Sequence, residues 1–432
     1  MSTGNPSGRP HVVQITCHDL GRFLGCYGVA TVRTPNLDRL AAAGVRCERA
    51  FATASGCSPS RAALATGRYP HANGVMGLAH DGFGWDLHPE ERHIAGLLRE
   101  QGFETHLFGL QHVTMRIERL GFGHVHRRGL GPAVAEDVEA VLAMPTAKPR
   151  YLEINLEEPH RPYDQGGVGP EASAGVWIPP WLPDTEATRE EMAALQGAVQ
   201  AADGAIGRIL AALDGAGLAE NTLVVFTADH GLAMPRAKCT LYDPGIGVAL
   251  IVRWPGGGVR TGGTVSPLIS NIDVLPTLLE AIGTAVPEGV QGRSFLPLLR
   301  GGAYSPRDAI YAEKTFHSYY DPMRAVRTER YKYIRNFETT FLVEVPGDVQ
   351  VGAIYRSELQ RYVAATHPAV ELYDLVADPL EQDDVAGQPV VAEVERELDA
   401  RVWRWMEETG DPLLAGPVPS PAYRGSLATR SP

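Results

Sequence analysis

The sequence contains few cysteines and no paired cysteine motif. Five cysteines occur in 432 residues, and none belongs to a CxxC pair: Cys17, Cys26, Cys47, Cys57 and Cys239. A disulfide framework or a structural zinc site is therefore not expected, and a reducing, cytoplasmic location is favoured. Four of the five are expected to be small buried hydrophobic residues. Cys57 needs separate treatment because of its neighbours.

Long apolar runs and an excess of positive charge are also missing. No stretch of about 18 apolar residues occurs, so no membrane-spanning helix is expected. The start, "MSTGNPSGRPHVVQITCHDLG", has no basic segment followed by an apolar one, and so does not resemble a secretory signal. Lys and Arg number 39 against 51 Asp and Glu, giving a formal net charge of -12. A nucleic-acid partner is therefore not expected, although one locally basic cleft could still bind a small anionic substrate.

Apolar strands and amphipathic helices alternate along most of the chain. Strand patterns end near residues 16, 109, 156 and 228, and helix patterns follow "TP" at 34–35, cover "ERHIAGLLREQ" and run from about 187 to 216. This alternation predicts an α/β fold with a mostly parallel sheet between two layers of helices. The strands end in "CHD", "GLQH", "EEPHR" and "ADHG". Because ligands bind at the carboxyl ends of parallel strands, we expect these four ends to converge.

The pattern changes after about residue 303. "RAVRTERYKYIRNF" alternates as antiparallel strands do, and "VVAEVERELDARVWRWMEETGD" is typical of an amphipathic terminal helix. We therefore predict a catalytic domain over 1–303 and a smaller C-terminal α+β domain over 304–432.

Carboxylates and imidazoles at two strand ends suggest a metal site. Asp19, Asp229 and His230 follow strands, and His18 precedes Asp19. Aspartate suits a hard divalent cation, and histidine widens the choice of metal. The alternative is an aspartate that only caps a loop.

Cys57 lies in "SGCSPSRAALATGRYP", residues 55–70. A helix beginning near Ser58–Ser60 would direct its free N–H groups toward residue 57, which lowers a thiol pKa and binds tetrahedral anions. Arg61, one turn further, could hold a charged oxygen. The alternative is a buried cysteine beside a capping serine.

The same stretch carries a family resemblance. "CSPSR" (57–61) followed by "ATGRYP" resembles the signature of type I sulfatases, and "TPNLDRLAAAGV", "FTADHG" and "ELYDLVADPLEQDDVAG" extend the likeness over essentially the whole chain. "KCTLYDPG" and "DPMRAVRTERYKYI" are similar to segments of the heparan N-sulfatase (sulfamidase) branch. The resemblance implies an alkaline-phosphatase-like fold and hydrolysis of a sulfate ester or sulfamate on a sugar or aryl group.

The resemblance also implies a mechanism. Cys57 would be converted to formylglycine by a separate formylglycine-generating enzyme. The hydrated aldehyde would then attack sulfur, release the alcohol or amine, and expel sulfate in a second step. One divalent metal ion would neutralise charge on the sulfate. Calcium is implied by the family, with manganese or zinc as alternatives.

Roles follow for individual positions. The residues implied as metal ligands are Asp19, Asp229, His230 and the residue derived from Cys57, with His18 as a further candidate. Arg61 would support the nucleophile, His112 could act as a base, and His160 would face the leaving group. Lys238 would touch sulfate, and His317 is a candidate for the substrate rim.

The sequence departs from the family pattern at the expected second aspartate and lysine. His18 stands where an aspartate is usual, and Leu110 stands where a lysine often precedes the site histidine by two residues. Because that lysine is absent and the Asp229–His230 pair is present, a phosphodiesterase or phosphonate monoester hydrolase on the same scaffold is an alternative function. A non-catalytic binding protein is a further alternative, and a homo-oligomer is compatible with the sequence. Loops over 76–90, 157–185 and 314–350 are expected to set specificity.

Overall fold

The computed structural model describes residues 8–428 except 81, 127 and 128. Its centre is an eight-stranded sheet with the order β10-β2-β9-β7-β1-β6-β4-β5, parallel except where β9 pairs with β2 and β7. Its strands are β1 His11–Cys17, β2 Val45–Cys47, β4 Glu104–Gly109, β5 His124–His126, β6 Arg150–Asn155, β7 Thr222–Ala228, β9 Leu250–Arg253 and β10 Gly263–Val265. β1 and β7 are buried along their whole length, because helices cover both faces of the sheet.

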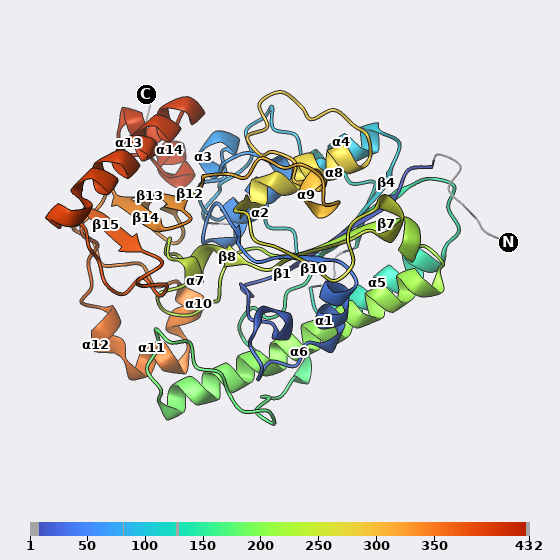
Figure 1. Ribbon diagram of the computed structural model, residues 1–432, viewed down its shortest axis with the longest axis horizontal. Helices are drawn as coiled ribbons and strands as arrows, with labels where there is room; N and C mark the ends of the chain where they lie inside the picture. Colours follow the sequence, from blue (N-terminus) through green and yellow to red (C-terminus); the bar gives the residue numbers. More distant parts are fainter. Residues whose placement is uncertain (1–7, 81, 127–128, 429–432) are drawn as a thin grey trace.

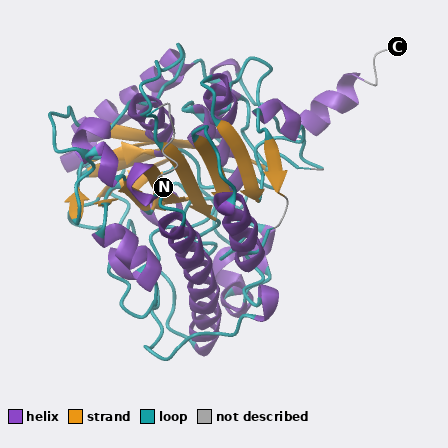
Figure 2. Cartoon of the chain, turned by 90° about the vertical axis from the view of Figure 1, so that its right-hand side faces the viewer, coloured by secondary structure: helices purple, strands orange, loops and turns teal. Residues whose placement is uncertain are grey.

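Two layers of helices enclose this sheet (Figure 1). One face carries α1 Pro35–Ala42, α5 Gly131–Ala143 and α6 Glu186–Gly215; the other carries α2 Cys57–Thr66, α4 Ile94–Glu100, α8 Val274–Ala281 and α9 Leu296–Leu299. Figure 2 shows the strands between helices on both sides. Short elements complete this part: α3 Pro70–Asn73, α7 Asp243–Ile246, and a small sheet of β3 Ala50–Phe51, β8 Gly247–Val248 and β11 Ile269–Ser270.

The sequence dictates where the helices start. Pro35 occupies the first turn of α1, where its missing N–H costs nothing. Thr185 precedes α6, and its side chain accepts a hydrogen bond from the Thr188 N–H. α2 begins at Cys57, slightly earlier than the predicted start near Ser58–Ser60, because Gly56 is the last extended residue. Cys57 is therefore the first residue of the helix.

The C-terminal region contains an antiparallel sheet, one long helix that packs on it, and several shorter helices. The strands are β12 Ala309–Phe316, β13 Tyr320–Thr328, β14 Tyr331–Asn336 and β15 Val370–Asp374; the helices are α10 Gly347–Gln350, α11 Ala353–Ser357, α12 Leu359–Tyr362, α13 Ala392–Thr409 and α14 Pro421–Ala428. Val402 and Trp405 of α13 share a buried cluster with Ala62 and Tyr69 near α2. This packing joins the region to the part that carries Cys57.

The predicted fold class is confirmed by these two sheets. The domain boundary at 303/304 stays a prediction, and the outermost residues of the two predicted domains, 1–7 and 429–432, lie outside the described residues. Among the helices of the described residues, none is both long and apolar enough to cross a membrane.

Candidate active site

Four adjacent parallel strands bring the predicted strand ends together. β7, β1, β6 and β4 are neighbours in the sheet, so their carboxyl ends lie along one edge. The ring of His18 lies 4.4 Å from that of His160, 6.3 Å from that of His112 and 6.4 Å from that of His230. The convergence expected from the strand pattern is therefore present in the structure.

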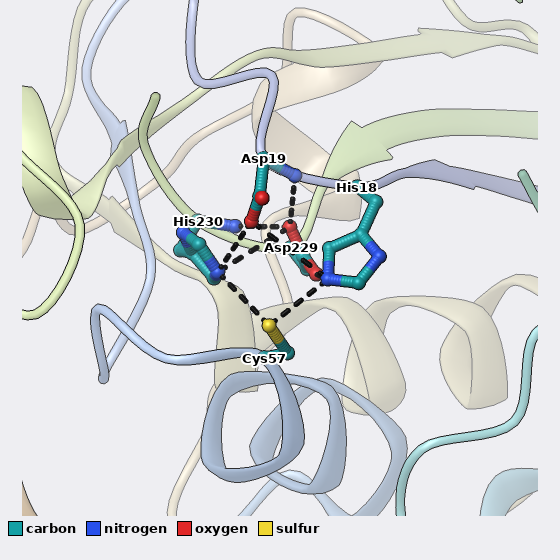
Figure 3. A group of neighbouring side chains, drawn as sticks. All are labelled: His18, Asp19, Cys57, Asp229 and His230. Atoms are coloured by element: carbon teal, nitrogen blue, oxygen red, sulfur yellow. Dashed lines mark hydrogen bonds and ion pairs between the residues drawn. The ribbon is translucent and has the colours of Figure 1, made fainter. Parts of the chain in front are cut away.

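Cys57 closes a group of five buried side chains (Figure 3). His18, Asp19, Cys57, Asp229 and His230 each offer one ligand atom, and these atoms all lie within 4.8 Å of one another. The Cys57 Sγ is 2.9 Å from His18 Nε2 and 3.4 Å from His230 Nε2. Such spacing is suited to a single small cation.

Acceptor atoms face each other in this group. His230 Nδ1 lies 3.0 Å from the Gly231 carbonyl oxygen, so Nδ1–H donates and Nε2 points at Asp19 Oδ1, 3.0 Å away. Asp19 Oδ1 is buried and makes no hydrogen bond. Burial alone would lower the pKa of His230, but the charges of Asp229 and Cys57 raise it well above its usual value. A cation, either a proton or a metal ion, therefore has to lie among these atoms, and the donor set fits a divalent metal.

The Cys57 thiol sits in an electropositive environment. Burial would raise its pKa, but Lys238, His18 and His230 hold it well below the usual value. His112 interacts with the same thiol, and burial lowers the pKa of this imidazole. Residue 57 is therefore surrounded by groups that stabilise a negative charge at its side-chain tip.

Arg61 is fixed one turn into α2. Its Nε donates to Asp229 Oδ2 at 3.0 Å, and its Nη1 donates to Asn155 Oδ1 at 3.1 Å. The remaining nitrogen, Nη2, is buried and has no hydrogen-bond partner. Arg61 therefore offers one unused donor beside residue 57.

Lys238 and His160 lie near Oδ2 of Asp19, whereas His230 lies near Oδ1 of the same carboxylate. Lys238 Nζ lies 2.9 Å from Asp19 Oδ2, and His160 Nε2 lies 3.8 Å from the same oxygen. His160 Nδ1 donates to the Arg161 carbonyl oxygen at 2.6 Å, which directs Nε2 toward the site. The His160 side chain is 23% exposed, against 4% for His18, so it faces the solvent side of the cluster.

The C-terminal region adds further residues. His317 follows β12, and its contacts with Cys239, Cys57 and Glu344 raise its pKa well above the usual value despite burial. Asp348 on α10 lies 2.8 Å from Lys238 Nζ and 3.8 Å from His160 Nε2. All ten predicted site residues thus lie around one centre.

Sequence reasoning missed Asp348, Asn155 and Glu344. Asn155 ends β6 and could have been found, because it occupies the last position of a strand whose end was expected at the site. Asp348 and Glu344 lie between β14 and β15, and their only signal was membership of the loop 314–350.

A family model described as Sulfatase matches residues 10–284, about two thirds of the chain. The chain belongs to the sulfatase family. A second model, described as the C-terminal part of N-sulphoglucosamine sulphohydrolase, matches residues 230–350 of this sulfatase. The enzymes of the family are hydrolases that act on sulfuric esters or sulfamates.

Individual relatives cover nearly the whole sulfatase chain. An ulvan-active sulfatase of Formosa agariphila is 30% identical over 420 residues, covering 94% of this chain and 82% of its own. The human N-sulphoglucosamine sulphohydrolase is 27% identical over 467 residues, covering 95% and 92%. The solved phosphonate monoester hydrolase of Agrobacterium radiobacter superposes with a TM-score of 0.73 at 21% identity, covering 94% and 97%, which shows a shared fold.

Proposed function

We propose that this protein hydrolyses a sulfate ester or sulfamate of a small anionic substrate, with residue 57 as the nucleophile after conversion of Cys57 to formylglycine. The observation that carries the proposal is the position of Cys57: it is the first residue of α2, and its Sγ contacts His18, His230 and His112. Formylglycine supplies a hydrated aldehyde whose oxygens would take the place of Sγ and attack sulfur. A separate maturing enzyme would install it.

The proposed metal ligands are His18, Asp19, Asp229 and His230, together with residue 57. A bound divalent ion supplies positive charge that stabilises the sulfate oxygens and an ionised nucleophile. Calcium is the ion that the family resemblance implies. Two imidazole nitrogens among the donors favour manganese or zinc in this chain, because calcium prefers an all-oxygen shell.

Two cations are proposed to hold the sulfate group. Arg61 Nη2 is buried without a partner, and Lys238 Nζ lies on the other side of Asp19. A sulfate oxygen would accept a hydrogen bond from Arg61 Nη2. This bond would remove the free-energy cost of keeping that donor buried without a partner. Position 110, where the family often has a lysine, carries the uncharged Leu110, so Lys238 is a cation that this chain still places near the site.

His112 and His160 are proposed to move protons on opposite sides of the sulfur. His112 contacts residue 57 and is placed to take a proton from the nucleophile. His160 Nε2 faces the more exposed side and is placed to give a proton to the departing oxygen or nitrogen. His317, which borders Gly56 at 3.4 Å from the position a Cβ would take, is proposed to form part of the substrate rim.

Asp348 is proposed to recognise the group attached to the sulfate. Its carboxylate lies beside His160, where it would accept a hydrogen bond from a hydroxyl or amine of the leaving group. A cavity of about 420 Å³, lined by His80, Gln111, His112 and Glu157 among others, adjoins the site and offers space for a substrate. These features support a sulfated sugar over a bare aryl sulfate.

One observation favours a second function. The Asp229–His230 pair and the absence of a lysine at Leu110 weaken the sulfate-specific features, and the same fold hosts a phosphonate monoester hydrolase. The test is the ratio of catalytic efficiencies on an aryl sulfate, a sulfamate and a phosphonate monoester. Preference for the phosphonate monoester by orders of magnitude would overturn the sulfatase proposal.

Mass spectrometry of the peptide that contains residue 57 tests the nucleophile. Conversion to the aldehyde lowers the peptide mass, whereas a non-catalytic binding protein would keep the thiol. Expression with a formylglycine-generating enzyme is required for this experiment. The cytoplasmic location, a homo-oligomer and the absence of a nucleic-acid partner stay predictions.

A further inference from the structure

A second group of histidines lies at the edge of the large sheet, away from the candidate active site. His106 of β4 and His124 of the edge strand β5 are paired in register, and Glu104 lies two residues before His106. Alternate residues of a strand share one face, so Glu104 and His106 point the same way. Glu104 starts β4, whereas the active site follows its end, about 16 Å further along the strand.

The three side chains present their ligand atoms to one point. His106 Nε2 is 3.6 Å and His124 Nε2 is 3.7 Å from Glu104 Oε1, and all three atoms lie within 4.8 Å of one another. Both distances are too long for hydrogen bonds. They approach the separation of about 3.4 Å between two ligands that hold a tetrahedral zinc ion at 2.0–2.1 Å.

The contact of His106 Nδ1 with His126 orients the ring so that Nε2 can act as a metal ligand. Only 4% of the residue is exposed, and its Nε2 is buried without a hydrogen-bond partner. Its other nitrogen, Nδ1, is 3.3 Å from His126 Nε2. Donation from Nδ1–H to His126 leaves the lone pair of His106 on Nε2, directed at Glu104.

Glu104 is held in a similar way. Arg150 Nε donates to Oε2 at 3.1 Å, and the Thr146 hydroxyl is 3.3 Å from the same oxygen. Oε1 is therefore left for the histidines. Arg150 offsets the charge of the carboxylate, so the affinity of the site would come chiefly from the imidazoles.

We propose that Glu104, His106 and His124 bind a divalent transition-metal ion of the zinc class, which ties β5 to β4. Two imidazoles and one carboxylate suit zinc far better than calcium or magnesium. The His124 side chain is 55% exposed, so its ring can turn toward the ion and water can complete the coordination. β5 is three residues long and pairs only with β4 in the described residues, so the ion would secure an edge with few other contacts.

The test is a zinc titration of the full-length, metal-stripped protein by calorimetry, with the His124→Ala variant alongside. His124→Ala should lose one equivalent of bound zinc, or bind it at least about tenfold more weakly, and keep aryl sulfatase activity. It should also lose the part of the zinc-dependent rise in melting temperature that belongs to this site. His88→Ala, which removes another exposed histidine, should titrate as the unaltered protein does.

The difference in zinc binding between the unaltered protein and His124→Ala reports on the edge site, because the two proteins have the same active site. An unchanged number and affinity of zinc equivalents in His124→Ala would overturn the proposal, as would an equal response to calcium. His126→Phe would keep the stacking on Phe108, whose ring lies 4.4 Å away, but remove the acceptor for His106 Nδ1. It should weaken zinc binding about 10- to 100-fold, and unchanged binding would refute the role of His126.

Discussion

The large sheet and the C-terminal region both contribute to the candidate active site, but they hold their residues by different means. His18, Asp19, Asp229 and His230 follow two neighbouring strands, whose pairing in register from His11–Thr222 to Cys17–Ala228 fixes the backbone. Their positions are therefore set by the core of the protein.

The C-terminal region reaches the site through side chains on short elements. Asp348 lies on a helix of four residues, and the adjoining α11 is anchored where the Ile354 N–H donates to Glu191 of α6 at 2.8 Å. Arg161, next to His160, forms an ion pair of 2.5 Å with the same glutamate. In the proposed function, the sheet would thus supply the groups for the chemistry at sulfur, and the C-terminal region would supply groups that face the remainder of the substrate.

The largest expected effect on activity distinguishes two cysteines, Cys57 and Cys239. Cys57→Ala should lower turnover by at least about 10⁴-fold, because it removes the side chain proposed to become the nucleophile. Cys239→Ala, whose thiol contacts His317, should lower it by less than about tenfold. The measurement is kcat/KM on an aryl sulfate, with conversion of residue 57 checked in each preparation. Equal losses in both variants would contradict the assignment of Cys57.

Metal removal should have the next largest effect. Chelation should reduce kcat by about 10²- to 10³-fold, the usual loss when a charge-stabilising contact is removed. Manganese or zinc should restore activity better than calcium, because His18 and His230 are nitrogen donors. His18→Asp, which restores the carboxylate usual in the family, should shift the preference toward calcium.

The difference in metal content between the unaltered protein and His18→Asp, after dialysis against equal concentrations of calcium, manganese and zinc, measures this preference without an activity assay, because zinc bound at the edge site is common to both proteins. Retention of calcium by the unaltered protein would contradict the preference predicted from the two imidazole donors. The same preparation of His18→Asp serves as the matched comparison.

The difference between the two regions also explains what could be predicted from the sequence. Each strand of the sheet carries its own apolar pattern, and the parallel topology then brings its polar end to the common edge. The placement of His112 and His160 was predicted in this way, whereas their roles were implied by the family resemblance. Asp348 and Glu344 lie in a connection whose course depends on distant packing, such as the contact of Ile354 with α6. The helix boundary at Cys57 differs from the prediction because the chain is still extended at Gly56 and becomes helical at the next residue.

Asp348→Asn should give a smaller effect that depends on the substrate. The change keeps the size of the side chain but removes its charge. A sulfated amino sugar should lose about tenfold in kcat/KM, because a charge-assisted hydrogen bond is weakened. A simple aryl sulfate should keep or improve its KM, since a negative charge near the sulfate is gone. Equal losses on both substrates would indicate that Asp348 only positions Lys238. Glu338→Gln is the control in the same region, at a partly buried acid that accepts hydrogen bonds from Thr340.

Substitution of His367, in the C-terminal region, should have the smallest effect on turnover. It should have a clear effect on the pH dependence of stability. Burial would lower the pKa of this histidine, but its contacts with Asp321 and Glu371 raise it to about 9. Because the folded-state pKa is raised, the stabilisation is complete below about pH 6.5 and is lost as the pH rises through 9. The free energy of unfolding should therefore fall by up to about 3 kcal/mol across this window. His367→Gln should flatten that slope in denaturant titrations, whereas His93→Gln, at a buried histidine whose pKa is lowered, should leave the slope unchanged. A slope that survives in His367→Gln would assign the pH dependence to other groups.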